Sequence, residues 1–279
     1  LCAIKLDLEK AFDKLEWGFI REALYHFQLP PSFINLILNC ISSSRLALII
    51  NGQTTEFFTP SGGIRQGDPI SPYIFIICME YLSQKIELLC SEKLWKPIKF
   101  GRQGPTLSHC FYVDDVILFS TAEFSSIQAV TIALNDFCLN SGLTVNYEKS
   151  KVLFSPNTPS AQKTLLSHML KINTTEDLGA YLGIPLTISK SSVRNCSFIL
   201  DKVKNKLQGW KSKPLSLAGR KTIAQQSISA IPAYYTQCLP LPQKICHEID
   251  KEQRRFLWGS TEDKQKIHFV SWDNITKDK

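Results

Sequence analysis

Apolar side chains recur every three or four residues along several long stretches of the chain, a spacing that buries one face of a helix. In the first two thirds of the sequence this spacing predicts helices over residues 11–27, 32–42, 71–90, 124–141 and 161–170. The predicted ends carry ordinary helix signals. Ser32 and Ser71 are the expected N-caps, Pro72 stands at a first helical position, and Gly142 follows a last turn.

Shorter apolar runs between turn residues predict strands in the same part of the chain. These runs lie within residues 1–8, 45–60, 109–120 and 143–155, and residues 180–187 are expected to form a strand or a turn. The run at 45–60 is expected to be a hairpin that turns at Asn51–Gly52, and the run at 109–120 to be strand, turn and strand. Because hairpins alternate with helices, the predicted fold class is α+β, with a largely antiparallel sheet and helices packed on it.

The last third of the chain keeps the helical spacing but becomes basic. Helices are predicted over residues 191–209, 216–230 and 242–258, punctuated by Pro232, Pro240 and Pro242. Residues 1–189 hold 15 Lys and Arg against 17 Asp and Glu, whereas residues 190–279 hold 17 against 8. We therefore expect two domains, 1–189 and 190–279. The second either meets a polyanion such as nucleic acid or is simply a solvated basic surface.

Composition and cysteine content narrow the class of protein. With 279 residues, 44% hydrophobic and 20% charged, the chain is typical of a globular protein with a large core. No apolar run is long enough to span a bilayer. The nine cysteines are scattered without CxxC or Cys/His spacing, which favours reduced, mostly buried thiols in an intracellular protein. Because the sequence starts at Leu1 inside an apolar run, we expect a piece cut from a longer protein.

Two adjacent carboxylates, Asp114 and Asp115, interrupt the apolar stretch 109–120. Asp is a common turn residue, so one interpretation is an ordinary hairpin turn. Two neighbouring carboxylates repel each other, however, and beside apolar strands they are partly desolvated. A bound divalent cation removes both penalties, and Mg²⁺ prefers carboxylate oxygens and shares them with phosphates. From this stretch alone the turn and the metal site are equally open.

A third carboxylate, Asp7, stands at the end of the predicted strand 1–8, just before a predicted helix. Complementation of the helix dipole would explain an acidic residue there. If the hairpin at 109–120 lies beside this strand, Asp7 and Asp114 could instead hold two cations about 3.5–4 Å apart, the arrangement used for phosphoryl transfer.

The segment 62–72 combines glycines with side-chain donors. Gly62, Gly63 and Gly67 allow a backbone to approach a ligand closely, and Arg65 and Gln66 lie between them. The segment leads into a predicted helix N-terminus, which favours phosphate. An ordinary glycine turn would explain the same residues.

Five segments follow one another in a recognisable order. They are KLDLEKAFD from Lys5, GIRQGDPISPYIF from Gly63, FYVDD from Phe111, SGLTVNYEKSK from Ser141 and YLGIPL from Tyr181. Together they resemble motifs A to E of the reverse transcriptase palm, and most closely those of plant non-LTR (LINE-type) retrotransposons. The resemblance covers roughly residues 1–187, and the segment 209–242 is similar to the region that follows the palm in that family. It implies a polymerase palm followed by a basic helical thumb and the start of a connection region, with the fingers absent before motif A.

The resemblance also implies roles for individual residues. Asp7 and Asp114 would be the metal-binding catalytic carboxylates, Leu8 would lend a backbone carbonyl, and Asp115 would support the turn. Phe12 would exclude a 2′-hydroxyl, although its spacing fits a core phenylalanine equally well. The residues implied in nucleotide and template binding are Arg65, Gln66, Gly67 and Lys149, with Lys151 as the competing choice for Lys149 and a solvated lysine pair as the alternative.

Two further groups of residues would hold nucleic acid. The turn expected to grip the primer 3′ end consists of Leu182, Gly183 and Ile184. The residues expected on the nucleic-acid backbone are Lys206, Lys211, Lys213, Arg220 and Lys221.

The implied activity is RNA-directed DNA polymerisation: Mg²⁺, or Mn²⁺, would support two-metal transfer of a dNTP to a primer 3′-hydroxyl on an RNA template, serving retrotransposition. The implied partners are template RNA, primer or target DNA and dNTPs, without a membrane, in the nucleus and in cytoplasmic ribonucleoprotein. Two alternatives stay open. One is a catalytically inactive relic or domesticated nucleic-acid-binding fragment, because the fingers are expected to be missing. The other is a protein like a group II intron maturase.

Overall fold

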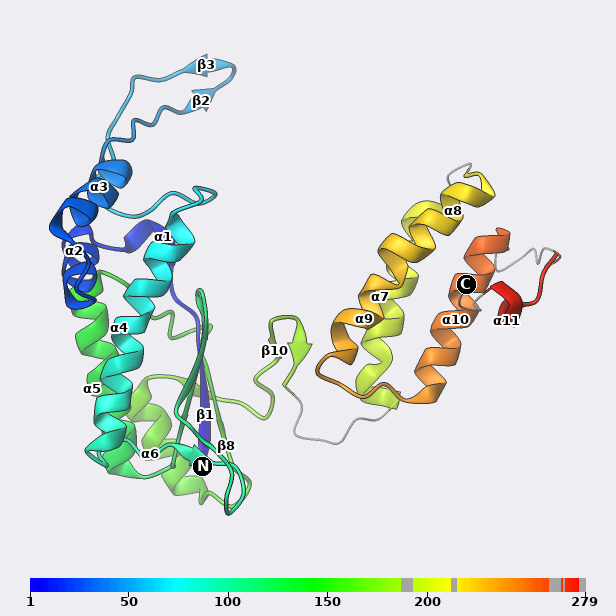
Figure 1. The fold of residues 1–279 in the computed structure, drawn as a ribbon. Coiled ribbons are helices and arrows are strands. Elements are labelled where there is room, and N and C mark those ends of the chain that lie inside the picture. Colours follow the sequence, from blue (N-terminus) through cyan, green and yellow to red (C-terminus); the bar gives the residue numbers. More distant parts are fainter. Residues whose placement is uncertain (187–192, 212–214, 261–266, 268, 276–279) are drawn as a thin grey trace. The chain divides into compact units, whose positions relative to one another are not determined.

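The computed structural model describes residues 1–186, 193–211, 215–260, 267 and 269–275 (Figure 1). The chain forms two compact units, Leu1–Leu182 and Gly183–Lys279, and each has its own buried apolar cluster. The domain boundary predicted between residues 189 and 190 lies outside the described residues. None of the helices in the described ranges combines the length and the apolar composition that crossing a bilayer requires.

The first unit is built on a five-stranded sheet with the strand order β6-β7-β1-β8-β9. Its strands are β1 (Cys2–Leu6), β6 (His109–Tyr112), β7 (Asp115–Ser120), β8 (Lys151–Phe154) and β9 (Asn173–Thr174). All neighbours are antiparallel except β8 and β9, so the predicted largely antiparallel sheet is confirmed. Strand β1 is central and alternates: Cys2, Ile4 and Leu6 are buried, whereas Ala3 and Lys5 on the other face are half-buried.

The longer helices of this unit share one buried apolar core with the sheet. They are α2 (Trp17–His26), α3 (Pro31–Ser42), α4 (Ser71–Ser91), α5 (Phe124–Ser141) and α6 (Ser160–Leu170). Figure 1 shows α2, α4 and α5 side by side, and they pack on one another through aromatic edges. The ring of Phe19 meets the rings of Tyr81 and Phe137 edge-on, at centroid distances of 5.4 and 5.6 Å. The predicted α+β class is therefore confirmed.

The helix predicted over residues 11–27 is wrong in one respect, because it is broken after its first turn. The short helix α1 (Ala11–Lys14) ends where Leu15 and Glu16 become extended, and α2 begins at Trp17. Two long-range hydrogen bonds hold the break: Gly63 N–H donates to the Leu15 carbonyl (2.8 Å), and Glu16 N–H donates to the Ser141 carbonyl (2.9 Å). Spacing of apolar residues does not reveal bonds to such distant partners.

The predicted caps also shift. Pro30 and Ile70, not Ser32 and Ser71, are the N-caps of α3 and α4, so both serines lie within the first turn. The Ser71 hydroxyl is buried and has no hydrogen-bond partner among the described residues. The C-cap prediction is confirmed, because Gly142 ends α5 with a φ of 76°.

The remaining strands are only two residues long, and they lie outside the five-stranded sheet. The predicted hairpin is confirmed as β2 (Ile49–Ile50) and β3 (Gln53–Thr54), joined by Asn51 and Gly52 with φ of 53° and 81°. A second hairpin of β4 (Ile98–Lys99) and β5 (Thr106–Leu107) was not predicted, because two-residue strands carry too little pattern. The stretch 180–187 contains β10 (Ala180–Tyr181) and β11 (Ile184–Pro185).

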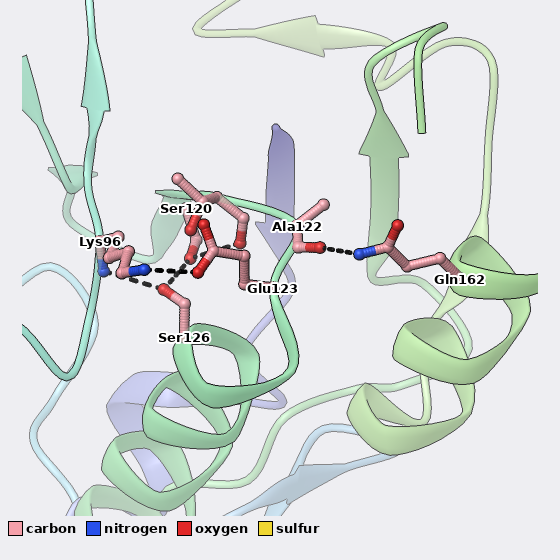
Figure 2. Close-up of polar contacts among 7 residues, drawn as sticks. Lys96, Ser120, Ala122, Glu123, Ser126 and Gln162 are labelled. Atoms are coloured by element: carbon pink, nitrogen blue, oxygen red, sulfur yellow. Dashed lines mark hydrogen bonds and ion pairs between the residues drawn. The ribbon is translucent and has the colours of Figure 1, made fainter. Parts of the chain in front are cut away.

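A buried polar network joins the end of β7 to the start of α5 (Figure 2). The hydroxyls of Ser120 and Ser126 are 2.7 Å apart, and Ser126 also accepts the Lys96 N–H (2.9 Å). Beside them, Gln162 Nε2 of α6 donates to the Ala122 carbonyl (2.5 Å). Buried hydroxyls satisfied in this way fix the position of α5 against the sheet.

The second unit is helical. It contains α7 (Val193–Lys211), α8 (Leu217–Ile223), the π-helix η1 (Ala224–Ile228), α9 (Ala230–Thr236), α10 (Gln243–Trp258) and α11 (Trp272–Ile275). Its core joins α7 to α10 through the buried side chains of Val203, Leu207, Ile245 and Ile249. The helix predicted over 216–230 continues past Pro232, because this proline lies in the first turn of α9, where its missing N–H is tolerated.

The cysteines agree with the predicted reduced state. All nine are free, of which three are buried, three half-buried and three exposed, so fewer are fully buried than expected. Burial raises the pKa of the Cys2 and Cys78 thiols to about 12, which makes them unreactive core residues.

We expect Gly63→Ala to lower the free energy of unfolding by about 2–4 kcal/mol. A Cβ at this position would lie 2.5 Å from the Asp13 carbonyl oxygen, and the φ of 78° is unfavourable for alanine. Urea unfolding would measure the change. Gly18→Ala is the matched control, because a Cβ added there would have no neighbouring atom within 4 Å and the residue stands inside α2. It should leave stability unchanged or raise it by up to about 1 kcal/mol, and equal unfolding midpoints for the two variants would contradict the proposed close approach.

The stability of the first unit should fall as the pH drops below about 6.5, the ordinary pKa of histidine. Burial lowers the pKa of His109, partly offset by the nearby Glu87, and both ring nitrogens lie 2.9 Å from the serine hydroxyls of Ser83 and Ser108. The unfolded chain therefore binds this proton more readily than the folded chain, so the contribution is complete above the unfolded pKa and is lost below it. Unfolding by urea at pH 7.5, 6.5 and 5.5 should show a shallower pH dependence for His109→Gln. The same slope in both proteins would refute this.

Candidate active site

The turn between β6 and β7 is strained at Val113. Tyr112 pairs with Asp115, so the two central turn residues are Val113 and Asp114, and Asp115 already begins β7. The turn therefore differs from the predicted Asp114–Asp115 pair by one residue. Val113 has a φ of 53°, a region that a β-branched residue rarely adopts. Such strain persists only where the flanking ladder imposes it, and it often occurs at functional sites.

Asp7 and Asp115 face the same side of the sheet. The register between β1 and β7 ends with Leu6 opposite Val116, and one further step places Asp7 opposite Asp115. Both carboxylates line one pocket of about 270 Å³. Asp114 is exposed at the turn and is not among the residues that line this pocket.

The backbone of Asp7 is fixed from both sides. Its N–H donates to the Ser150 hydroxyl (3.1 Å), and its carbonyl accepts the Asn146 N–H (2.8 Å). Ser150 is buried and donates in turn to the Asn146 carbonyl (2.7 Å). Leu8, the next residue, forms an isolated bridge with Val145. The segment that resembles motif D therefore holds the segment that resembles motif A.

Three ammonium groups share the pocket with the two carboxylates. Lys149 and Lys151, the two lysines that the sequence could not separate, both line it, as does Lys5. An anionic group such as a phosphate can bind where lysines outnumber carboxylates, and a divalent cation can bind between the carboxylates. The pocket therefore suits a phosphate ester that arrives together with a cation.

Part of this pocket was not predicted from the sequence. Lys5 Nζ donates to the carbonyl of Ala180, and Leu178, Gly179 and Ala180 complete the wall. A signal for Lys5 was available, because residues two apart on a strand point to the same face and Lys5 is two residues from Asp7. No comparable signal existed for the loop before β10.

Arg65 and Gln66 come together, but in another pocket. They line a pocket of about 530 Å³ together with Gly62, Gly63 and Ile64 of the glycine loop and with Asp13 and Leu46 from outside it. Gly67 is exposed with a φ of 90° and lines neither pocket. The loop is anchored by Ile64 N–H to the Phe12 carbonyl (2.7 Å).

The position of Phe12 is compatible both with a core phenylalanine and with a residue that faces a nucleotide sugar. Its ring is half-buried and stacks on Phe75 of α4, with centroids 5.0 Å apart and planes 9° from parallel. Phe12 thus packs against the core while part of the ring stays accessible.

The predicted primer-grip residues form a tight turn. Leu182 and Gly183 have φ of 51° and 77°, and Ile184 begins β11. Two successive positive φ values are those of a type I′ turn. Burial, followed by the charges of Cys110 and Asp115, raises the pKa of the neighbouring Tyr181 phenol.

The predicted backbone-binding residues of the second unit differ in accessibility. Lys206 and Lys221 are exposed on α7 and α8. Arg220 is half-buried, with its guanidinium packed on Gly259 at the end of α10. Lys211 is the last residue of α7, and Lys213 lies outside the described residues.

The donor set at the pocket fits a shared Mg²⁺ ion better than a closed metal site. Within the described part of the chain, no group of three or more His, Cys, Asp or Glu side chains is arranged to hold a metal. Asp7 and Asp115 nevertheless supply two carboxylates at one pocket. Mg²⁺ is usually held by one or two carboxylates, with water and substrate phosphates completing the shell.

The chain resembles known proteins over most of its length. It is 26% identical to the Retrovirus-related Pol polyprotein from type-2 retrotransposable element R2DM of Drosophila melanogaster, over 65% of this chain and 17% of that protein. It is 25% identical to the Transposon TX1 uncharacterized 149 kDa protein of Xenopus laevis, over 92% of this chain and 19% of that protein. The chain thus spans less than a fifth of the length of either relative. A solved structure of apo telomerase from Candida tropicalis aligns with 93% of this chain and 47% of its own, at 14% identity and a TM-score of 0.49.

A family model covers about two thirds of the chain. Residues 1–186 match the family described as reverse transcriptase (RNA-dependent DNA polymerase). The matched range includes both pockets and every element of the five-stranded sheet. The chain belongs to the reverse transcriptase family.

Proposed function

We propose that this chain is the palm and thumb of a non-LTR retrotransposon reverse transcriptase of the LINE type found in plants, and that it adds dNTPs to a primer 3′-hydroxyl on an RNA template. The observation that carries the proposal is the pocket shared by Asp7, Asp115, Lys149 and Lys151, within a chain segment that matches the reverse transcriptase family. The TX1 and R2DM relatives, whose names describe transposable elements, support the retrotransposon context. The expected site of action is the nucleus and cytoplasmic ribonucleoprotein.

The acidic residues of the site would bind the metal, and its lysines would neutralise phosphate charge. Asp7 and Asp114, with the Leu8 carbonyl, would hold Mg²⁺ or Mn²⁺, which when bound lowers the pKa of the 3′-hydroxyl and stabilises the leaving pyrophosphate. Asp115, not Asp114, lines the pocket with Asp7, so the choice of Asp114 as the second ligand follows its place in the segment that resembles motif C. Its carboxylate is exposed at the turn, where an incoming metal–nucleotide complex can reach it. Asp115 would orient the turn opposite Asp7, and Lys149 or Lys151 would neutralise charge on the pyrophosphate.

The remaining residues would position substrate. Arg65, Gln66 and Gly67 would contact nucleotide and template from the glycine loop, and the accessible edge of Phe12 would oppose a 2′-hydroxyl. The Leu182–Gly183 turn and Ile184 would support the primer end. The basic helices would hold the nucleic-acid backbone through Lys206, Lys211, Lys213, Arg220 and Lys221.

A second candidate function is nucleic-acid binding without turnover. It is favoured by the exposed lysines of α7 and α8, which need no catalytic partner. Primer extension separates the two candidates, because only the polymerase extends a primer.

We expect Asp7→Asn and Asp114→Asn each to lower primer extension by at least about a thousandfold, because each removes a ligand of the metal that stabilises the transition state. Asp115→Asn should lower it less. The assay is extension of oligo(dT) on poly(rA) with Mg²⁺ or Mn²⁺. Asp201→Asn, an exposed carboxylate on α7, is the control and should keep full activity. Normal extension by Asp114→Asn would refute the assignment, and loss with Asp115→Asn alone would transfer the metal to Asp115.

Lys206→Gln and Lys221→Gln should each weaken binding to an RNA–DNA duplex and reduce the slope of log K against log salt by about 0.9 for each phosphate that is no longer neutralised. Fluorescence anisotropy between about 50 and 200 mM salt would measure both quantities. Lys202→Gln is the matched control in α7. The Lys202 ammonium donates to the Tyr235 hydroxyl (2.5 Å) and lies 5.2 Å from the centre of that ring, so it is already engaged. A slope that is unchanged in all three variants would exclude α7 and α8 as the contact surface.

A further inference from the structure

Lys5 is the one lysine of the pocket that lies on the central strand. It pairs with Ile117 of β7 on one side and with Lys151 of β8 on the other. Strand β1 is hydrogen-bonded along both edges, so the Lys5 backbone is held more firmly than a loop residue would be. Its side chain leaves the sheet on the face that Asp7 and Asp115 share, because residues two apart on a strand point the same way.

The Lys5 ammonium is used for a contact with the backbone. Its Nζ donates to the carbonyl of Ala180, the first residue of β10. The contact is exposed, but a hydrogen bond from a charged donor is stronger than one between neutral groups. The contact therefore fixes one point of the 178–182 segment against the face that carries the carboxylates.

The segment that Lys5 holds leads directly into a turn. Residues Leu178, Gly179 and Ala180 line the pocket, and Leu182 and Gly183 follow with two positive φ values. Burial, followed by the charges of Cys110 and Asp115, raises the pKa of the Tyr181 phenol between them. The position of the turn relative to Asp7 and Asp115 thus depends on where Ala180 is held.

We propose that Lys5 is a positioning residue that sets the distance between the 180–182 segment and the Asp7–Asp115 face. The proposal rests on the proposed function for its consequence: a primer end supported by this turn would be presented to the carboxylates only while Lys5 holds Ala180. Lys5 does not itself touch the reacting atoms in this role. It differs in this respect from Lys149 and Lys151, which share the pocket and are assigned to the leaving group.

Lys5→Met tests the anchor, because it keeps the length of the side chain and removes the donor. Hydrogen exchange of the full chain, followed by mass spectrometry, should show the amides of residues 180–182 exchanging about tenfold faster. Lys5→Arg, which restores a charged donor, should return exchange to within about threefold of the unmodified chain. Lys151→Met removes a charge from the same pocket at the register partner of Lys5, and should leave exchange at 180–182 unchanged. Unchanged exchange in Lys5→Met, or an equal increase in Lys151→Met, would overturn the proposal.

The catalytic consequence is read from a second measurement. Lys5→Met should raise the KM for primer–template about tenfold, with the KM for dNTP and kcat at saturating primer changed less than about threefold, and Lys5→Arg should reverse the effect. A general loss of structure would lower kcat and the melting temperature as well, which would count against a positioning role. Exchange needs no turnover. If the unmodified chain extends no primer, the proposed function fails, while the exchange result and primer affinity by anisotropy still decide the role of Lys5.

Discussion

The first unit depends on a close approach of three backbone segments at the break between α1 and α2. The carbonyl of the extended Leu15 accepts a hydrogen bond from Gly63 N–H in the glycine loop. The N–H of Glu16 donates to the carbonyl of Ser141 at the end of α5. A side chain at Gly142 would lie 2.7 Å from the Lys14 carbonyl, and one at Gly63 would lie 2.5 Å from the Asp13 carbonyl. Only glycine fits at these two points, so the segments that resemble motifs A, B and D meet there at backbone distance.

This contact between backbone segments positions the charged residues of the pocket, although none of its own residues lines that pocket. Only a few residues separate Asp7, at the end of β1, from the break. Between them, Glu9 N–H donates to the Thr144 carbonyl (2.9 Å). The same 144–150 segment then satisfies the Asp7 peptide on both sides and supplies Lys149 to the pocket. The backbone on both sides of the carboxylate and the lysine is thus held by main-chain hydrogen bonds and by the buried Ser150 hydroxyl, which positions charged side chains more firmly than contacts between flexible side chains could.

The sequence predicted features that depend on local chemistry and missed those that depend on distant partners. The Asn51–Gly52 hairpin and the Gly142 cap were correct, because turn and cap preferences act over a few residues. The first strand ends at Leu6, one residue before the predicted end. The break at Leu15, the two-residue strands β4 and β5, and the π-helix before Pro232 were missed, since tertiary bonds override spacing there. In the site, residue types indicated Asp7 and the motif resemblance indicated Lys149 or Lys151, whereas only the fold separates the pocket of Asp115 from that of Gln66.

The register between β1 and β7 has a consequence for how this protein can change over evolutionary time. Side chains along a strand alternate between the two faces of the sheet, so the register of β1 with β7 decides which residues share a face. In this register Asp7 and Asp115 emerge on the same face. Substitutions within β7 alter packing but leave that parity intact. A single inserted or deleted residue between Asp115 and Ser120 would reverse it and turn the carboxylate toward the core. Sequence change in β7 is therefore restricted to substitutions. An insertion or deletion in β7 would identify a gene copy whose carboxylate site has been lost.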